Sequence, residues 1–167
     1  MENIMRELPY QVFVYGSLKR GEYNNDCITQ HGGVFLSTAK TIGTYLLFGG
    51  AFPKLAAYHD MSKAQARQHK SYKGHVAGEL WRVSAEGLAA LDRLEGCPQH
   101  YRRETIEVST SSGMRQPWAY FIVRVPFDSS PLLEPAKDGT LAWHSPRVER
   151  LNPFRERKAE AVRPDRR

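Results

Sequence analysis

The sequence has few of the features that cross-link a chain or hold it in a membrane. Among 167 residues only Cys27 and Cys97 are cysteines, too few for a disulfide framework and typical of a reducing cytoplasm. Neither belongs to a C-x-x-C pair or a Cys/His cluster, so no metal site is expected. No apolar run approaches the ~18 residues that span a bilayer, and the start MENIMRELPY has no apolar segment of a secretory signal. We therefore expect a cytoplasmic protein with no membrane partner.

Two common catalytic motifs are also missing. There is no G-x-x-x-x-G-K-[ST] segment, so a nucleotide-binding P-loop is not indicated. There is no G-x-S-x-G nucleophile elbow, because Gly16 stands directly beside Ser17. Ser17 as a nucleophile would also need a positioned histidine, and the arrangement of the six histidines nominates none.

Positive charge is concentrated near the C-terminus. Residues 141–167 hold eight Lys or Arg against four Asp or Glu, whereas the first 140 residues hold sixteen against fourteen. A basic tail can hold nucleic acid by charge, but such tails are more often solvated or disordered ends. We therefore expect no nucleic-acid partner, and we divide the chain into a folded domain at 1–126 and a basic, partly disordered extension at 127–167.

The apolar pattern predicts many strands and one clear helix. The run QVFVYG at 11–16 is typical of a buried strand. Further strands are expected at 34–50, 52–58 and 75–83 and in a hairpin around 111–113, with a polar, basic excursion at 58–74. Ser84 is a suitable N-cap for the helix SAEGLAALDRLEG, and Gly96 supplies its left-handed end. These elements predict an α+β fold, a small mixed, barrel-like sheet with the helix packed on one side.

One acidic residue lies on the apolar side of this helix. At about 100° per residue, Glu95 falls in the sector between Leu88 and Leu91. The apolar surroundings and the negative end of the helix dipole should both raise its pKa, which suits a general base at neutral pH. The alternative is a glutamate at a frayed helix end that reaches water or a neighbouring donor. Asp92 flanks the same sector, as a second acid or as a rim residue.

The strand at 11–16 runs into the turn Tyr15-Gly16-Ser17-Leu18. Consecutive N–H groups without a ladder partner can hold a carboxylate or a developing oxyanion. Gly16 would allow a substrate to approach the backbone closely. The plain alternative is an ordinary turn at the end of a strand.

Two separated motifs resemble one family. VFVYGSLKRGEYNN at 12–25 resembles the Y-G-[ST]-L signature of the gamma-glutamylcyclotransferase superfamily, and its K-R-G-x-x-N part resembles the gamma-glutamylamine cyclotransferase and AIG2-like branch. LDRLEGCPQHYRR at 91–103 resembles the second motif of that branch, an acid at a leucine-rich helix end followed by Cys-Pro and Tyr-x-Arg. Residues 74–94 match the strand-then-helix passage between them. The resemblance covers about 12–125 and implies that 1–126 is the catalytic domain.

The resemblance also implies a barrel-like fold with a cavity and a reaction that needs no metal or organic cofactor. The α-amine of a gamma-glutamyl group would attack its own γ-carbonyl, expelling an amine and closing 5-oxoproline, with Glu95 as general acid and base. The N–H groups of Gly16–Leu18 would hold the α-carboxylate or the oxyanion. Tyr101 would form a pocket wall, and Tyr15 would line the pocket or belong to the core. Arg103 would either steady Tyr101 or lie on the surface.

The resemblance leaves the substrate open. The small-molecule partner is a gamma-glutamylamine, gamma-glutamyl-lysine from crosslinks, a gamma-glutamyl amino acid or an acyl-protected biosynthetic intermediate. The basic segment 58–74, long for the family, lies where it could set specificity. A second hypothesis is a non-catalytic member that binds a small acidic ligand or a protein through the same cavity. The sequence indicates no oligomeric state.

Overall fold

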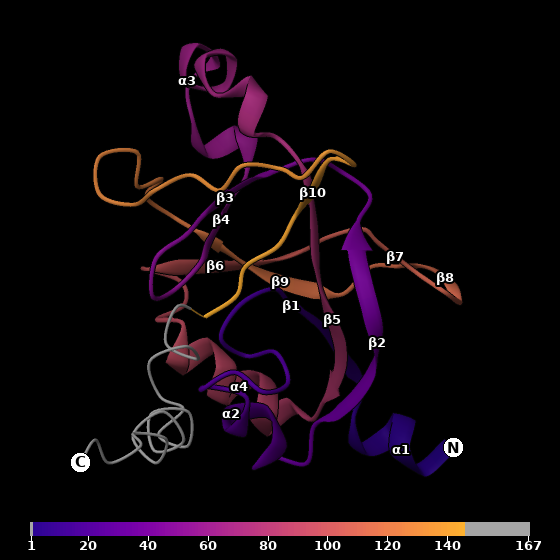
Figure 1. Cartoon of the computed structure of the whole chain (residues 1–167). Coiled ribbons are helices and arrows are strands. Elements are labelled where there is room, and N and C mark those ends of the chain that lie inside the picture. The colour runs from indigo at the N-terminus through magenta and orange to yellow at the C-terminus, as the bar shows by residue number, and fades with distance from the viewer. Residues whose placement is uncertain (1, 146–167) are drawn as a thin grey trace, which may run out of the picture.

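A long curved sheet and a separate two-stranded sheet organise the computed structural model, which describes residues 2–145 (Figure 1). The strands are β1 (Tyr10–Val14), β2 (Val34–Thr41), β3 (Leu46–Phe48), β4 (Lys54–Ala56), β5 (His75–Val83), β6 (Tyr101–Thr105), β7 (Val108–Thr110), β8 (Gly113–Arg115), β9 (Trp118–Ile122) and β10 (Thr140–Leu141). The helices are α1 (Glu2–Glu7), α2 (Asp26–Thr29), α3 (Lys63–Gln68) and α4 (Ala85–Leu94), with 3-10 turns η1 (Tyr58–Asp60) and η2 (Lys70–Tyr72).

The large sheet is mixed. Its strand order is β6-β9-β1-β5-β2-β7-β8, with β10 beside β5, while β3 and β4 pair with each other. β1 is antiparallel to β5 and parallel to β9. Figure 1 shows α2 and α4 together at one end of the sheet and α3 projecting from the opposite end. The predicted α+β class, with a curled mixed sheet and one main helix against it, is confirmed.

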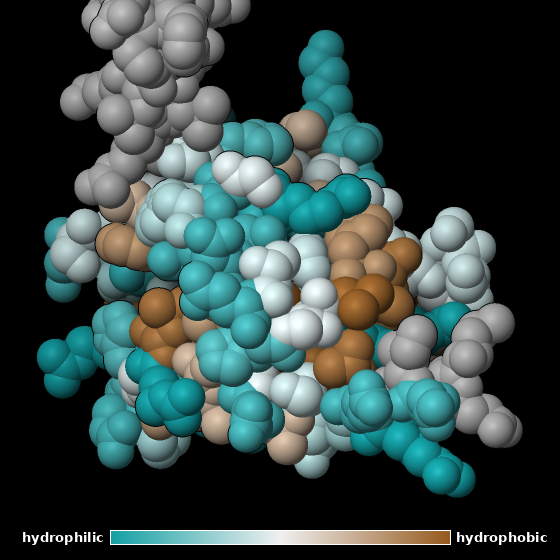
Figure 2. All heavy atoms as spheres, turned by 90° about the horizontal axis from the view of Figure 1, so that it is seen from below, coloured by the Kyte–Doolittle hydropathy of each residue, from teal (hydrophilic) through white to brown (hydrophobic). Residues whose placement is uncertain are grey.

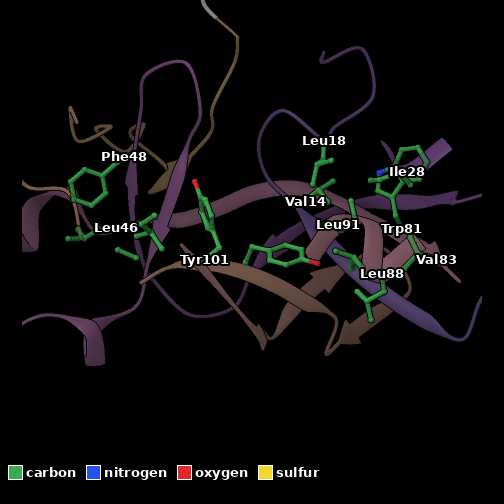
Figure 3. Close-up of a cluster of buried hydrophobic side chains, with 14 residues drawn as sticks. Val14, Leu18, Ile28, Leu46, Phe48, Trp81, Val83, Leu88, Leu91 and Tyr101 are labelled. Carbon is green, nitrogen blue, oxygen red and sulfur yellow. The ribbon is translucent and has the colours of Figure 1, made fainter. Parts of the chain in front are cut away.

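β1 lies in the middle of the sheet and is buried on both faces. Val12 and Val14 belong to one hydrophobic cluster, whereas Phe13 and Tyr15 belong to another, as expected when successive side chains of a strand point to opposite faces. Figure 3 shows the first cluster, where Tyr101 lies between the side chains near β3 and those near α4. Burial on both faces explains why the residues from Val12 to Tyr15 are apolar or aromatic without a break.

α4 begins and ends where the sequence predicted. The Ser84 hydroxyl accepts the Gly87 N–H at 3.0 Å, and Gly96 has a φ of +62° just after the helix. Leu88 and Leu91 are buried against the sheet. Glu86 and Arg93 of the same helix are exposed, so α4 has the amphipathic character expected from its sequence. The face of the molecule seen from below is mainly hydrophilic, with hydrophobic residues in separate groups (Figure 2).

β5 approaches β1 closely at a glycine, as the sequence predicted. A Cβ atom at Gly78 would lie 2.3 Å from the carbonyl oxygen of Val14 and 2.7 Å from the ring of Phe13. The predicted hairpin around 111–113 is also present, because β7 pairs with β8 and β6 pairs with β9. The helix α1 and the strand β10 were not predicted.

The segment after residue 126 folds onto the sheet as far as residue 145. The Leu133 N–H donates to the Leu47 carbonyl at 2.9 Å, Trp143 is 2% exposed, and β10 pairs in parallel with β5. Residues 146–167 lie outside the described part, and with them nearly all of the basic tail and the nucleic-acid hypothesis that depends on it. No helix within 2–145 is long and apolar enough to cross a membrane.

Candidate active site

A cavity of about 270 Å³ lies where the end of β1, the segment before β4 and the end of α4 meet. All six residues singled out from the sequence line it: Tyr15, Gly16, Ser17, Leu18, Glu95 and Tyr101. The fold thus brings two distant motifs to the walls of one cavity. Their chemical roles stay predictions.

The turn at the end of β1 is held by the asparagines that follow it. The Asn24 side-chain amide donates to the Ser17 hydroxyl oxygen at 3.0 Å, and the Asn24 N–H donates to the Ser17 carbonyl at 2.9 Å. The Asn25 amide donates to the Leu18 carbonyl at 2.8 Å. Among the described residues, the N–H groups of Ser17 and Leu18 have no backbone acceptor. The segment KRGEYNN therefore fixes the turn while leaving these two donors free for a ligand.

Pro53, in the neighbouring wall of the cavity, leaves room only for a glycine at position 16. A Cβ atom at this position would lie 2.2 Å from the Cγ atom of Pro53, closer than two carbon atoms can approach. The Pro53 carbonyl in turn accepts the Tyr101 O–H at 3.2 Å. The glycine was expected to allow a substrate to approach the backbone, and its contact with Pro53 adds a packing reason for it.

Glu95 follows directly after the last residue of α4. Its N–H donates to the Leu91 carbonyl at 2.9 Å, so the helical hydrogen-bond pattern extends to it. Burial raises the pKa of Glu95 from 4.5 to about 7, with no other cause contributing. Within residues 2–145, no cation or hydrogen-bond donor pairs with the Glu95 carboxyl. The alternative in which Glu95 binds a neighbouring donor is therefore not supported. The predicted upward direction of the pKa agrees with this value, and its cause is burial, whereas the predicted contribution of the helix dipole does not appear.

Two tyrosines form buried walls of the cavity, Tyr15 directly after β1 and Tyr101 at the start of β6. The Tyr15 O–H donates to the Tyr120 carbonyl at 2.6 Å and accepts the Leu55 N–H at 3.4 Å. Burial is the main cause that raises the pKa of both hydroxyls, followed by Tyr101 and then Glu95 for Tyr15, and by Glu95 for Tyr101. Both therefore stay neutral at physiological pH. Tyr15 both lines the cavity and belongs to the core, so the two alternatives for it hold together.

Asp92 supports the cavity from behind. It accepts two hydrogen bonds from the Arg103 guanidinium, at 2.9 and 3.2 Å, and one from the Tyr120 O–H at 2.7 Å. Tyr120 lines the cavity, whereas Asp92 and Arg103 do not. Asp92 is therefore neither a second acid nor a rim residue. Arg103 steadies Tyr120 through Asp92, and its guanidinium lies 4.5 Å from the centre of the Trp118 ring.

Sequence reasoning missed part of the lining. The cavity also contacts Asn24, Phe52, Lys54, His100 and Tyr120. Asn24 is the final residue of the K-R-G-x-x-N pattern, so that motif could have identified it. His100 lies within the second motif at 91–103, where it was not singled out. Phe52, Lys54 and Tyr120 belong to segments that carry no chemical signature, and only the tertiary structure places them here.

The basic excursion at 58–74 does not line this cavity. It holds η1, α3 and η2, and α3 projects away from the sheet (Figure 1). The Arg102 guanidinium ties it to β6 through Asp60, with an Nη2–Oδ2 distance of 2.7 Å. The idea that this segment sets specificity at the mouth is therefore not supported. Among the described residues no group of three or more His, Cys, Asp or Glu is arranged to hold a metal.

The fold and the cavity together define a class of protein. In this class a small mixed sheet carries a turn at the end of one strand, here the turn after β1, and a helix places a carboxyl, here that of Glu95, in the same cavity. A family model described as "Gamma-glutamyl cyclotransferase, AIG2-like" matches residues 12–143. The chain therefore belongs to that family, and the resemblance stated from the two motifs is confirmed.

Relatives and solved structures agree with this assignment. A provisionally named gamma-glutamylcyclotransferase of Methanocaldococcus jannaschii is 30% identical over 111 residues, which are 66% of this chain and 82% of that protein. The gamma-glutamylaminecyclotransferase of Rattus norvegicus is 35% identical over 58% of this chain, which spans 62% of the rat protein, less than two thirds. The crystal structure of a mouse AIG2-like protein matches with a TM-score of 0.57 and 26% identity, covering 70% of this chain and 80% of that one.

Proposed function

We propose that this chain is a gamma-glutamyl cyclotransferase that releases 5-oxoproline and a free amine from a gamma-glutamyl compound. Family membership and the names of the relatives support this activity. The observation that carries it is Glu95, a carboxyl with a pKa of about 7 in a cavity that also contains the turn after β1.

The proposed reaction is intramolecular. Glu95 takes a proton from the α-ammonium of the substrate, and the freed amine forms a bond to the γ-carbon, so that the carbonyl oxygen becomes negatively charged. The attacking nitrogen, now bonded to the γ-carbon, carries a positive charge. When this intermediate collapses, the bond to the leaving amine breaks, and that amine takes the proton held by Glu95. Glu95 then takes the second proton from the ring nitrogen, which leaves the neutral lactam of 5-oxoproline, and it passes this proton to the departing amine or to water. A tethered nucleophile closing a five-membered ring obtains much of its rate from orientation. The scheme is balanced without a metal or an organic cofactor.

The turn after β1 supplies the stabilising groups. The N–H groups of Ser17 and Leu18, with Gly16, would hold the α-carboxylate of the substrate or the developing oxyanion. Asn24 and Asn25 fix this turn before substrate arrives, through the contacts described above. Preorganised donors stabilise charge without reorganising during the reaction.

The pKa of Glu95 suits this proton transfer. A base works best when its pKa lies near the working pH, because it is then substantially unprotonated and still basic enough to accept a proton. At about 7, Glu95 is a much stronger base than an ordinary glutamate. Tyr15 and Tyr101 would close the cavity around the reacting atoms with neutral hydroxyls.

We further propose that the protein works in the cytoplasm, where its two cysteines, both free, would remain reduced. Such a location fits an activity on small gamma-glutamyl compounds.

The test is to incubate the purified protein with a panel of gamma-glutamyl compounds and to measure 5-oxoproline. Glu95→Gln should lower kcat by about 10²–10⁴-fold, the usual contribution of general acid–base catalysis. Glu86→Gln removes an exposed carboxyl from the same helix and should leave the rate unchanged. Full activity in Glu95→Gln would contradict the mechanism. A compound that binds the wild type without turnover would instead favour the non-catalytic hypothesis.

A further inference from the structure

The segment 58–74 holds all of the positive surplus of the first 140 residues. It carries four Lys or Arg against one Asp, whereas the rest of these residues carries twelve against thirteen. Its one acid, Asp60, is already held by the Arg102 guanidinium, with an Nη2–Oδ2 distance of 2.7 Å. The expectation of no nucleic-acid partner rested on the tail after residue 140, whereas this surplus lies in the folded part of the chain.

The four cations gather around one open depression of about 400 Å³ on α3 and η2. Ala66 completes its lining, and the cations, here called the basic patch, are Lys63, Arg67, Lys70 and Lys73. Among the described residues no carboxylate forms an ion pair with any of the four. Like charges on one surface repel one another, so a bound polyanion would be attracted to the patch and would relieve the repulsion.

The basic patch stands on a firm support. The Ser62 hydroxyl accepts the Gln65 N–H at 3.1 Å and the Gln65 side chain accepts the Ser62 N–H at 3.0 Å, so α3 begins with a capping box. Just after α3, the His69 ring stacks on Phe127 with ring centres 4.5 Å apart, and Phe127 packs against Phe48 of the core. α3 itself buries no residue and projects from the sheet (Figure 1). The cations are therefore fixed in place while they face outward.

The composition of the patch distinguishes between polyanionic partners. Protein–protein interfaces are enriched in aromatic residues and methionine and depleted in lysine, whereas this lining has three lysines and no aromatic ring. A helix that lies in a membrane surface buries an apolar face, whereas α3, with the sequence KAQARQ, offers only two alanines. Phosphate contacts need only Lys and Arg. Since the lining has no ring on which unpaired bases could stack, a duplex fits it better than a single strand.

We propose that the basic patch binds the phosphate backbone of a duplex nucleic acid without reading its sequence. This surface is separate from the cavity, because no residue of 58–74 lines the cavity. The inference therefore does not depend on the proposed function. Four cations predict weak binding, in the range of about 10⁻⁴–10⁻⁶ M that is typical of non-specific contacts at physiological salt.

The test measures the binding of the full chain to a fluorescein-labelled DNA duplex of about 20 base pairs, by fluorescence anisotropy between about 0.05 and 0.2 M salt. The variant combines Lys63→Gln, Arg67→Gln and Lys70→Gln. Glutamine has nearly the helix propensity of lysine and arginine, so α3 should persist. At the lowest salt Kd should rise about tenfold, the combined effect of three exposed charge contacts. The slope of log Kd against log salt should fall by up to about three, because each phosphate contact contributes about 0.9.

A matched control removes three positive charges elsewhere. The combined variant Arg6→Gln, Arg93→Gln and Arg115→Gln takes them from α1, α4 and β8, and it should change Kd less than about threefold because distant charges are screened. The basic tail is present in all three proteins, so its own contribution cancels, and both variants should keep the wild-type urea midpoint.

Equal losses in the two combined variants would show that net charge or the tail holds the DNA, and would overturn the inference. Absence of binding by the wild type at the lowest salt would also overturn it. So would binding to phosphatidylserine vesicles or to poly-glutamate without binding to the duplex, because the patch would then serve a membrane or an acidic protein.

Discussion

Replacing Glu95 by glutamine should stabilise the folded protein, and the gain should grow with pH. The folded pKa of about 7 lies above the ordinary value of 4.5 because burial disfavours the charged carboxyl. Below pH 4.5 the carboxyl is protonated in both the folded and the unfolded chain, so glutamine changes little. Between pH 4.5 and 7 the unfolded chain ionises first, and the wild type loses stability.

Above pH 7 the difference between the free energies of unfolding of Glu95→Gln and the wild type reaches its limit. At 1.36 kcal/mol per pKa unit, the raised pKa of Glu95 costs the wild type up to about 3 kcal/mol at pH 8. This free energy is an upper limit, because water reaches part of the Glu95 side chain. Glutamine is close to glutamate in shape and carries no charge, so it should recover most of this free energy.

The assay is urea unfolding at pH 4, 5.5, 7 and 8.5, followed by the fluorescence of the three tryptophans. Glu86→Gln, from the exposed first turn of the same helix, serves as the control and should change the free energy of unfolding by less than about 0.5 kcal/mol. A gain in Glu95→Gln that is the same at pH 4 and pH 8.5, or absent at both, would show that the Glu95 carboxylate is not desolvated in the folded state.

Three further predictions concern the cavity. In the wild type, kcat/KM for 5-oxoproline formation should rise with pH up to about 7 and then level, because unprotonated Glu95 acts as the base; a profile already flat from pH 5 would exclude this role. Gly16→Ala should lower the free energy of unfolding by about 1–3 kcal/mol, since the added methyl group collides with Pro53; unchanged urea midpoints would contradict this packing. Asn24→Ala should lower kcat/KM about tenfold at a stability cost below about 1.5 kcal/mol, because it removes the amide that holds Ser17; full activity would mean that the turn keeps its shape unaided.

The local sequence was sufficient to predict most of the helices and strands. α4 could be predicted with both ends because its signals are local: Ser84 caps the first turn, Leu88 and Leu91 repeat at helical spacing, and Gly96 permits a left-handed φ. β1 could be predicted because its part that is buried on both faces, Val12–Val14, is apolar without a break. By contrast, β10 has two residues, and it pairs with His75 and Val76 of β5, which lie beyond the part of β5 that pairs with β1.

The candidate site was only partly predictable. Glu95 could be singled out because its position on an apolar helix face is visible in the spacing of the leucines. Asp92, one turn earlier, looked equally acidic, and nothing local shows that Arg103 and Tyr120 occupy its carboxylate. Lys54 carries no local signal at all, because a lysine at the start of a strand is ordinarily solvated.

The sequence by itself determined the two motifs, the α+β class and the presence of an acid on the wrong face of a helix, since all of these depend on neighbours within a few residues. Only the tertiary structure decided which side chains share the cavity. β1 and the segment before β4 meet there because Gly16 has no Cβ atom and Pro53 fills that space. The end of α4 completes the cavity because Leu88 and Leu91 anchor the helix in the core that contains Val12 and Val14. The burial that raises the pKa of Glu95 is therefore a property of the assembled fold, which no single segment of the chain possesses.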